Sequence, residues 1–181
     1  MQILGLRSFS GYPPQADFTP LQDHIFFENM KNHEYYMREA LKEAVKAFDA
    51  DEVPVGAIIV HKGEIIGRAH NQIKTLKDPT AHAEIIAITQ AANFLQSERL
   101  TDCVMYSTLE PCSMCAGAMV LSRIKSLIYA VKDPKTGAHE SVFNILNNKK
   151  LNHRVKVRSE ILEQESSSLI KEFFKIKRNK Y

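Results

Sequence analysis

Hydrophobic residues in the first third of the chain change their spacing twice, and each change marks a predicted element. Between residues 32 and 49 they recur every one, three or four positions, which predicts an amphipathic helix; they are Tyr36, Met37, Leu41, Val45 and Phe48. Residues 53–60 (VPVGAIIV) form a short apolar run, and residues 64–71 (EIIGRAHN) follow after a turn. Two such segments joined by a short polar turn predict a β-hairpin.

The rest of the chain alternates predicted helices and strands. The sequence Asp78-Pro79-Thr80 indicates the start of a helix that continues to residue 95, with Pro79 at the first helical position. The sequence Glu110-Pro111 opens a second helix, over residues 112–124. The predicted strands are 103–108, 126–131 and a short one at 155–157, and a final helix begins near residue 159. Residues 132–152 are loop-like, with at most one helical turn at 141–146.

This alternation predicts an α/β fold, a three-layer α/β/α sandwich around a mixed central sheet of about five strands. The chain has 181 residues, which fits one domain. We place that domain at residues 31–181 and expect it to end in a basic helix. Residues 1–30 are predicted to be an irregular, poorly ordered leader, because five glycines and prolines interrupt any periodic pattern; these are Gly5, Gly11, Pro13, Pro14 and Pro20.

Composition excludes several classes of protein. No run of 18 apolar residues is present, so we expect no membrane span, and the N-terminus lacks the apolar region of a signal peptide. The expected location is the cytoplasm. Three cysteines are too few for a disulfide framework. The net charge of +3 permits a nucleic-acid partner without requiring one.

Two short motifs carry the candidate chemistry. Cys112 and Cys115 are three residues apart, so at the start of a helix they share a face, and the helix dipole favours their thiolate forms. His82 and Glu84 would point about 200° apart in the middle of a helix, but in a first turn both can reach a point beyond the helix end. Two helix starts that meet would therefore place His82, Cys112 and Cys115 around one metal ion, with Glu84 beside it.

Three protein ligands with a fourth position for water are typical of catalytic zinc, whereas structural zinc usually has four protein ligands. Bound zinc lowers the pKa of water to about 7, and a glutamate beside it can move protons. Alternatives remain open. His70 or His139 could complete a closed structural site, the C-x-x-C pair could be redox-active, or the metal could stabilise an RNA-binding module without catalysis. Cys103 lies in an apolar strand and is predicted to be a buried small hydrophobe.

The pattern H-x-E followed by P-C-x-x-C is the signature of zinc-dependent nucleobase deaminases. The flanking sequence is more specific and reads EVPVGAIIV, HNQ, DPTAHAEI, TLEPCSMCAGAM, SRI, DPKTGA and NHR. From about residue 33 onward the chain resembles the bacterial tRNA-specific adenosine deaminases. The resemblance implies a cytidine-deaminase-like fold, a homodimer with one zinc ion per subunit, and conversion of the wobble adenosine of a tRNA, usually an arginine tRNA, to inosine. A guanine or cytosine-nucleotide deaminase of the same superfamily is the alternative.

The resemblance also implies a set of site residues. By motif match, the metal ligands are His82, Cys112 and Cys115, and Glu84 is the proton shuttle. The substrate-binding residues are Asn71, which hydrogen-bonds the flipped nucleoside, Val55, which lines the base pocket, Ala83, and Lys135, Phe174 and Arg178 at the RNA. Residues 1–30 have no counterpart in the family, and Lys177 stands where the family has arginine. Residues 171–181 contain five lysines and arginines against one glutamate, which favours contact with RNA phosphates.

Overall fold

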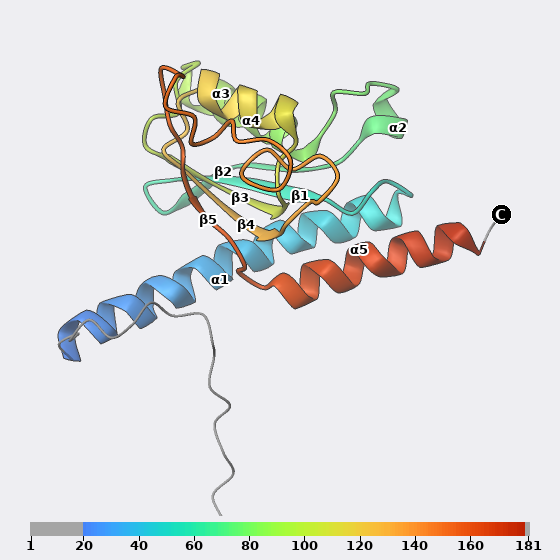
Figure 1. The fold of residues 1–181 in the computed structure, drawn as a ribbon, viewed down its shortest axis with the longest axis horizontal. Helices are drawn as coiled ribbons and strands as arrows, with labels where there is room; N and C mark the ends of the chain where they lie inside the picture. Colours follow the sequence, from blue (N-terminus) through green and yellow to red (C-terminus); the bar gives the residue numbers. More distant parts are fainter. Residues whose placement is uncertain (1–19, 180–181) are drawn as a thin grey trace, which may run out of the picture.

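A mixed five-stranded sheet forms the centre of the molecule. The computed structural model describes residues 20–179, with side chains from residue 33 onward. The strands lie in the order β2-β1-β3-β4-β5 (Figure 1). Their bounds are Gly56–His61 for β1, Glu64–His70 for β2, Cys103–Leu109 for β3, Ser126–Val131 for β4 and Lys156–Arg158 for β5. Strand β1 pairs antiparallel with β2 and β3, whereas β3, β4 and β5 run parallel.

Helices cover both faces of this sheet. Helices α3 (Ala83–Leu95) and α4 (Ser113–Leu121) lie on one face, and α1 (Pro20–Asp49) and α5 (Glu163–Arg178) lie on the other (Figure 1). Successive residues of β1 point to opposite faces of the sheet. Ile59 packs in the core between the sheet and helices α3 and α4, and Ile58 packs in the core between the sheet and α1. The predicted three-layer α/β/α sandwich with a mixed sheet of five strands is confirmed.

The first helix is longer than predicted. It begins at Pro20, twelve positions before Asn32, so residues 20–30 are helical and the prediction of an irregular leader is wrong for them. Proline suits the first position of a helix, and a helix that has already formed over residues 33–49 extends at little further cost. Residues 1–19, the rest of the predicted leader, lie outside the described part of the chain.

The helix that carries His82 begins later than predicted. Pro79 is outside it, because the Asp78 carboxylate accepts hydrogen bonds from both the backbone N–H and the hydroxyl of Thr80 at 2.7 Å and closes a local turn. A short helix, α2 (Ile73–Leu76), was not predicted, and the buried Glu52 carboxylate holds it by accepting the Lys74 and Thr75 N–H groups at 2.8 Å.

Several smaller differences remain. The helix predicted over residues 112–124 ends at Leu121, the last strand spans 156–158 instead of 155–157, and the final helix, predicted from near residue 159, begins at Glu163. Strand β1 starts at Gly56, so residues 53–55 precede it, and residues 141–146 form no helical turn. Within residues 20–179, none of the helices combines the length and the apolar character that crossing a bilayer requires.

Candidate active site

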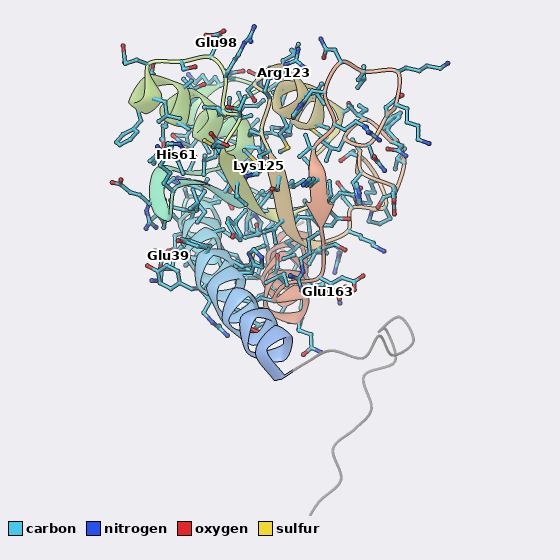
Figure 2. All side chains as sticks on the ribbon, turned by 90° about the vertical axis from the view of Figure 1, so that its left-hand side faces the viewer. Glu39, His61, Glu98, Arg123, Lys125 and Glu163 are labelled. Atoms are coloured by element: carbon cyan, nitrogen blue, oxygen red, sulfur yellow. The ribbon has the colours of Figure 1, made fainter. Side chains whose placement is uncertain are left out.

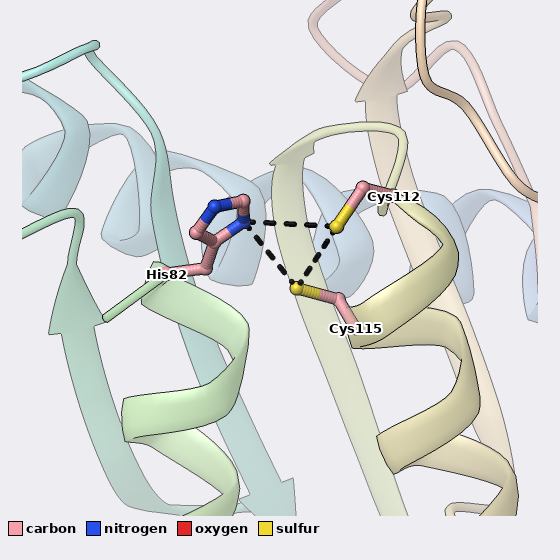
Figure 3. Close-up of side chains that lie close together, drawn as sticks. All are labelled: His82, Cys112 and Cys115. Carbon is pink, nitrogen blue, oxygen red and sulfur yellow. Dashed lines mark hydrogen bonds between the residues drawn. The ribbon is translucent and has the colours of Figure 1, made fainter. Parts of the chain in front are cut away.

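Two helix starts meet at one edge of the fold. His82 is the N-cap residue of α3 and Cys112 is the N-cap residue of α4, and both have extended backbone conformations. Cys115 lies in the first turn of α4, with Sγ 3.6 Å from Cys112 Sγ. Because α3 and α4 lie side by side on the same face of the sheet, the three side chains converge (Figure 3). The convergence predicted from the two motifs is present.

The three donor atoms form a nearly equilateral triangle. His82 Nδ1 is 3.7 Å from Cys112 Sγ and 3.6 Å from Cys115 Sγ (Figure 3). All three lie within 4.8 Å of one another, and within the part of the chain that the structure describes they are the only group of three or more such residues that could hold a metal ion.

Hydrogen bonds within this cluster shift the pKa values of its members in different directions. The contact with Cys115 is the largest cause that lowers the pKa of Cys112, to about 4, and the same contact raises the pKa of Cys115. The hydrogen bond with Cys112 raises the pKa of His82 above its ordinary value. The cluster therefore holds a thiolate at neutral pH, the form of cysteine that binds metals.

Glu84 lies one residue into α3 and is 3% exposed. Burial raises the pKa of its carboxyl, which interacts with the side chain of Cys115. A carboxyl in a dry environment beside a cluster of metal-type donors has the properties of a group that exchanges protons with a reacting molecule.

Asn71 ties the start of α3 to the sheet. Its Oδ1 accepts the backbone N–H of Ala83 at 2.9 Å, and its own N–H donates to the carbonyl of Val55 at 3.1 Å. All three residues are buried. The end of β2, the segment before β1 and the start of α3 are thereby joined directly beside His82.

Two histidines considered as a fourth ligand lie elsewhere. His70 Nδ1 is 3.5 Å from a carboxylate oxygen of Glu43. His139 Nδ1 is 3.2 Å from the hydroxyl of Tyr129, and the two rings meet edge to face. Neither joins the three donors, so the described residues do not form a closed site with four protein ligands.

The residues predicted to contact RNA are distributed over two parts of the surface. Lys135 is exposed on residues 133–141, the segment that follows β4 and contacts Cys112 through a backbone bridge at Gly137. Phe174 and Arg178 lie on α5, on the face of the sheet opposite to α3 and α4, and both are exposed (Figure 1). Lys177, by contrast, forms an ion pair with Asp51 and lies over the ring of Phe173.

Sequence reasoning missed Glu110, which it used only as a helix signal. The side chain is 2% exposed, and both carboxylate oxygens accept hydrogen bonds from the segment 133–141. Burial opposes its ionisation, but hydrogen bonds from Ser141 and from backbone N–H groups outweigh that effect and lower the pKa of Glu110. A charged residue between an apolar strand and the P-C-x-x-C motif was the available signal, because a buried charge requires partners.

A deaminase is the class of protein that this fold and this site define, and a family profile described as MafB19-like deaminase matches residues 31–178. The tRNA-specific adenosine deaminase of Aquifex aeolicus is 55% identical over 146 residues, which cover 81% of this chain and 96% of the relative. The enzyme of the same name from Bacillus subtilis is 44% identical over 151 residues, 83% of this chain and 94% of the relative. The chain belongs to the family of tRNA-specific adenosine deaminases.

A solved structure agrees with this assignment, and a more distant one shares the fold. One from a study of A-to-I editing by tRNA:A34 deaminases superimposes with a TM-score of 0.72 at 43% identity, covering 75% of this chain and 98% of the other. A guanine deaminase from Nitrosomonas europaea gives a TM-score of 0.69 at 21% identity and shares the fold alone.

Proposed function

We propose that this protein converts adenosine to inosine at the wobble position of a tRNA anticodon by zinc-dependent hydrolysis. The observation that carries the proposal is the meeting of three metal-type donors with the buried carboxyl of Glu84 at two helix starts. Membership of a family whose relatives are named tRNA-specific adenosine deaminases supports tRNA as the substrate. From the family resemblance we infer an arginine tRNA, and from a tRNA substrate we infer a cytoplasmic location.

The donor set fits zinc. Tetrahedral zinc, with Zn–S of about 2.3 Å and Zn–N of about 2.0–2.1 Å, separates its sulfur and nitrogen ligands by roughly 3.6–3.8 Å. The three distances among His82, Cys112 and Cys115 are 3.6, 3.6 and 3.7 Å. One zinc ion held by these residues would act as a Lewis acid and would lower the pKa of water at its fourth position to about 7.

Glu84 is assigned both proton transfers. As the water oxygen bonds to C6 of the adenine, Glu84 accepts a proton from that water and delivers it to ring N1. Glu84 then takes the second proton from the new C6 hydroxyl and transfers it to the amino group. The C6–N bond breaks, ammonia leaves and inosine remains. Burial of Glu84 suits this role because its raised pKa brings the carboxyl closer to neutral pH.

We assign the binding of the target nucleoside and its base to Asn71, Val55 and Ala83. The Oδ1 atom of Asn71 already accepts the N–H of Ala83, which leaves the amide nitrogen of Asn71 to contact the flipped nucleoside. The Val55 side chain, 5% exposed, supplies an apolar wall. An anticodon loop base costs little to unstack, which suits a site that must receive a single base.

The distribution of charge supports an RNA partner. Residues 123–158 contain nine lysines and arginines against two acidic residues, whereas residues 1–122 contain ten against fifteen. Within this segment, Arg123 and Lys125, labelled in Figure 2, precede β4 at the end of the sheet away from the cluster. The exposed Lys135 follows β4, two residues before Gly137, which pairs with Cys112. Basic surface of this kind binds phosphates and releases counterions.

The deciding experiment is to incubate the purified protein with total tRNA and sequence the products. Inosine is read as guanosine, so the proposal predicts an A-to-G change at the wobble position of arginine tRNA and no change with heat-inactivated protein. Release of ammonia from guanine or cytosine nucleotides, without inosine in tRNA, would instead identify a small-molecule deaminase.

The exposed cations of α5 are proposed to bind the anticodon stem-loop. Replacing Lys175 and Arg178 by glutamine should weaken binding and lower the slope of log K against log salt by about 1.4–1.8, the contribution of two phosphate contacts. Lys177 is left in place because, with Lys74, it pairs with Asp51 and holds the pKa of that carboxyl at about 2.

The measurement is the dissociation constant for a labelled anticodon stem-loop at several salt concentrations. The matched control replaces Lys62 and Arg99 by glutamine, since both are exposed at the opposite end of the sheet from the cluster. An unchanged dissociation constant and salt slope in the α5 variant would leave its cations as a solvated helix end.

We also propose a homodimer formed through the helices beside the site. Leu121 on α4 is 79% exposed and Phe94 on α3 is 58% exposed, which is apolar surface of the kind that a partner covers. On the same helix, Met119 and Val120 are buried in the core and Met114 is partly buried against it, so we assign none of these three to the dimer surface.

Light scattering should give twice the chain mass of 20.6 kDa, and Leu121→Asp should shift the protein toward a monomer. The same substitution at Leu76, which is exposed on α2, should leave the mass unchanged. A monomeric wild type at working concentration would contradict the dimer.

A further inference from the structure

Glu110 is the buried carboxylate nearest to the cysteine motif along the chain. It follows β3 directly and precedes Pro111 and Cys112. One carboxylate oxygen accepts the N–H of Asp133 at 3.0 Å together with the hydroxyl of Ser141, and the other accepts the N–H of His139 at 2.9 Å. The N–H groups of Glu140 and Ser141 lie at 3.2 and 3.4 Å from that second oxygen.

All of these donors belong to one segment, residues 133–141. Asp133 is at its start and Ser141 at its end, so a single side chain holds both ends of the loop. Within the loop, the N–H of Ala138 donates to the carbonyl of Pro111 at 2.9 Å, and Gly137 pairs with Cys112 through an isolated bridge. The segment therefore lies against the residues that begin α4.

Because Gly137 has no side chain, there is room beside it for the Glu110 carboxylate. A Cβ at this position would overlap Glu110 Cδ, and it would lie 2.5 Å from Glu110 Oε2 and 2.6 Å from the carbonyl of Asp133. Any side chain at residue 137 would push the carboxylate away from its donors or push the loop outward. Glu110 and Gly137 thus form one packed unit.

The same loop carries an exposed cation. Lys135 is exposed, and its backbone N–H is fixed by the Asp133 carboxylate at 2.9 Å. Because Asp133 is itself held by Glu110, the position of Lys135 relative to Cys112 depends on this buried carboxylate.

We propose that Glu110 is a positioning residue for the RNA substrate, holding the segment 133–141 against the start of α4 so that Lys135 faces the bound anticodon loop. The inference rests on the proposed function. The three donors are placed by the helices, because His82 and Cys112 are the N-cap residues of α3 and α4 and Cys115 lies in the first turn of α4; Cys112 also pairs with Gly137 of the loop.

Glu110→Gln preserves the volume of the side chain but puts an NH₂ group where only acceptors fit, so at least one buried N–H loses its partner. We expect KM for an anticodon stem-loop to rise about tenfold or more, with kcat within about threefold of wild type and the metal retained. Hydrogen exchange of the amides of 133–141 should become faster. Gly137→Ala should produce the same pattern by moving the loop from the other side.

Glu140→Gln is the control, since it makes the same chemical change on the same segment at an exposed side chain. It should match wild type. A fall in kcat and metal content at unchanged KM would make Glu110 a structural anchor only and overturn the proposal, as would wild-type behaviour of Glu110→Gln. Absence of inosine from the wild-type reaction would refute the proposed function, and the positioning role with it.

Discussion

Replacing Glu84 by alanine is expected to lower the turnover of adenosine by about 10²–10⁴-fold or more, with the metal still bound. General acid–base catalysis accounts for a factor of this size in a single transfer, and here one carboxyl is assigned two transfers. The side chain is not among the three donors of the cluster, so its loss removes no metal ligand. Single-turnover formation of inosine in an anticodon stem-loop measures the effect, and elemental analysis measures the metal.

Glu84→Gln makes this test stricter. The amide keeps the shape of the buried side chain but cannot accept the proton of water, so it should be about as inactive as alanine. Glu98→Gln changes an exposed glutamate just beyond the end of α3 and should leave turnover unchanged. Normal turnover in Glu84→Gln would remove Glu84 from the mechanism.

Replacing Cys115 by alanine is expected to abolish both metal binding and turnover. The substitution deletes one of three donors and leaves only His82 and Cys112, too few to hold zinc against a chelator. Elemental analysis after dialysis against a chelator should give about one zinc ion per chain for wild type, as a site with three protein ligands predicts, and close to none for the variant.

Cys103→Ala is the matched control for this result. Cys103 is also a buried cysteine, but it lies in β3 and burial raises its pKa to about 11, so it stays a neutral thiol at neutral pH. The variant should retain its metal. Wild-type protein without stoichiometric metal, or Cys115→Ala with it, would overturn the assignment of the cluster.

Local pattern predicted most of the elements, because strand and helix each impose their own short repeat on apolar residues. Strand β4 begins and ends at the predicted residues, 126 and 131, and β3 differs by one residue at its end. Helix starts were less predictable. A turn closed by the Asp78 side chain moved the start of α3 to Ala83, and proline followed by helix-compatible residues moved the start of α1 to Pro20.

The candidate residues of the site were also readable from sequence, since histidine, glutamate and two cysteines stand out at these spacings. The geometry of these residues could not be predicted from sequence, because His82 and Cys112 are 30 residues apart and meet only where α3 and α4 start at the same edge. Whether His70 or His139 would join them was likewise decided by tertiary contacts, with Glu43 and Tyr129 respectively.

The sequence by itself determined the fold class, the identity of the metal-type donors and the concentration of positive charge. Only the tertiary structure decided which charged side chains are engaged by partners within the protein. Lys177 pairs with Asp51, 126 residues earlier in the chain, and Glu110 is engaged by a loop more than 20 residues later. Short-range periodicity carries no information about such pairs, because they form only when packing of the helices on the sheet brings distant segments together.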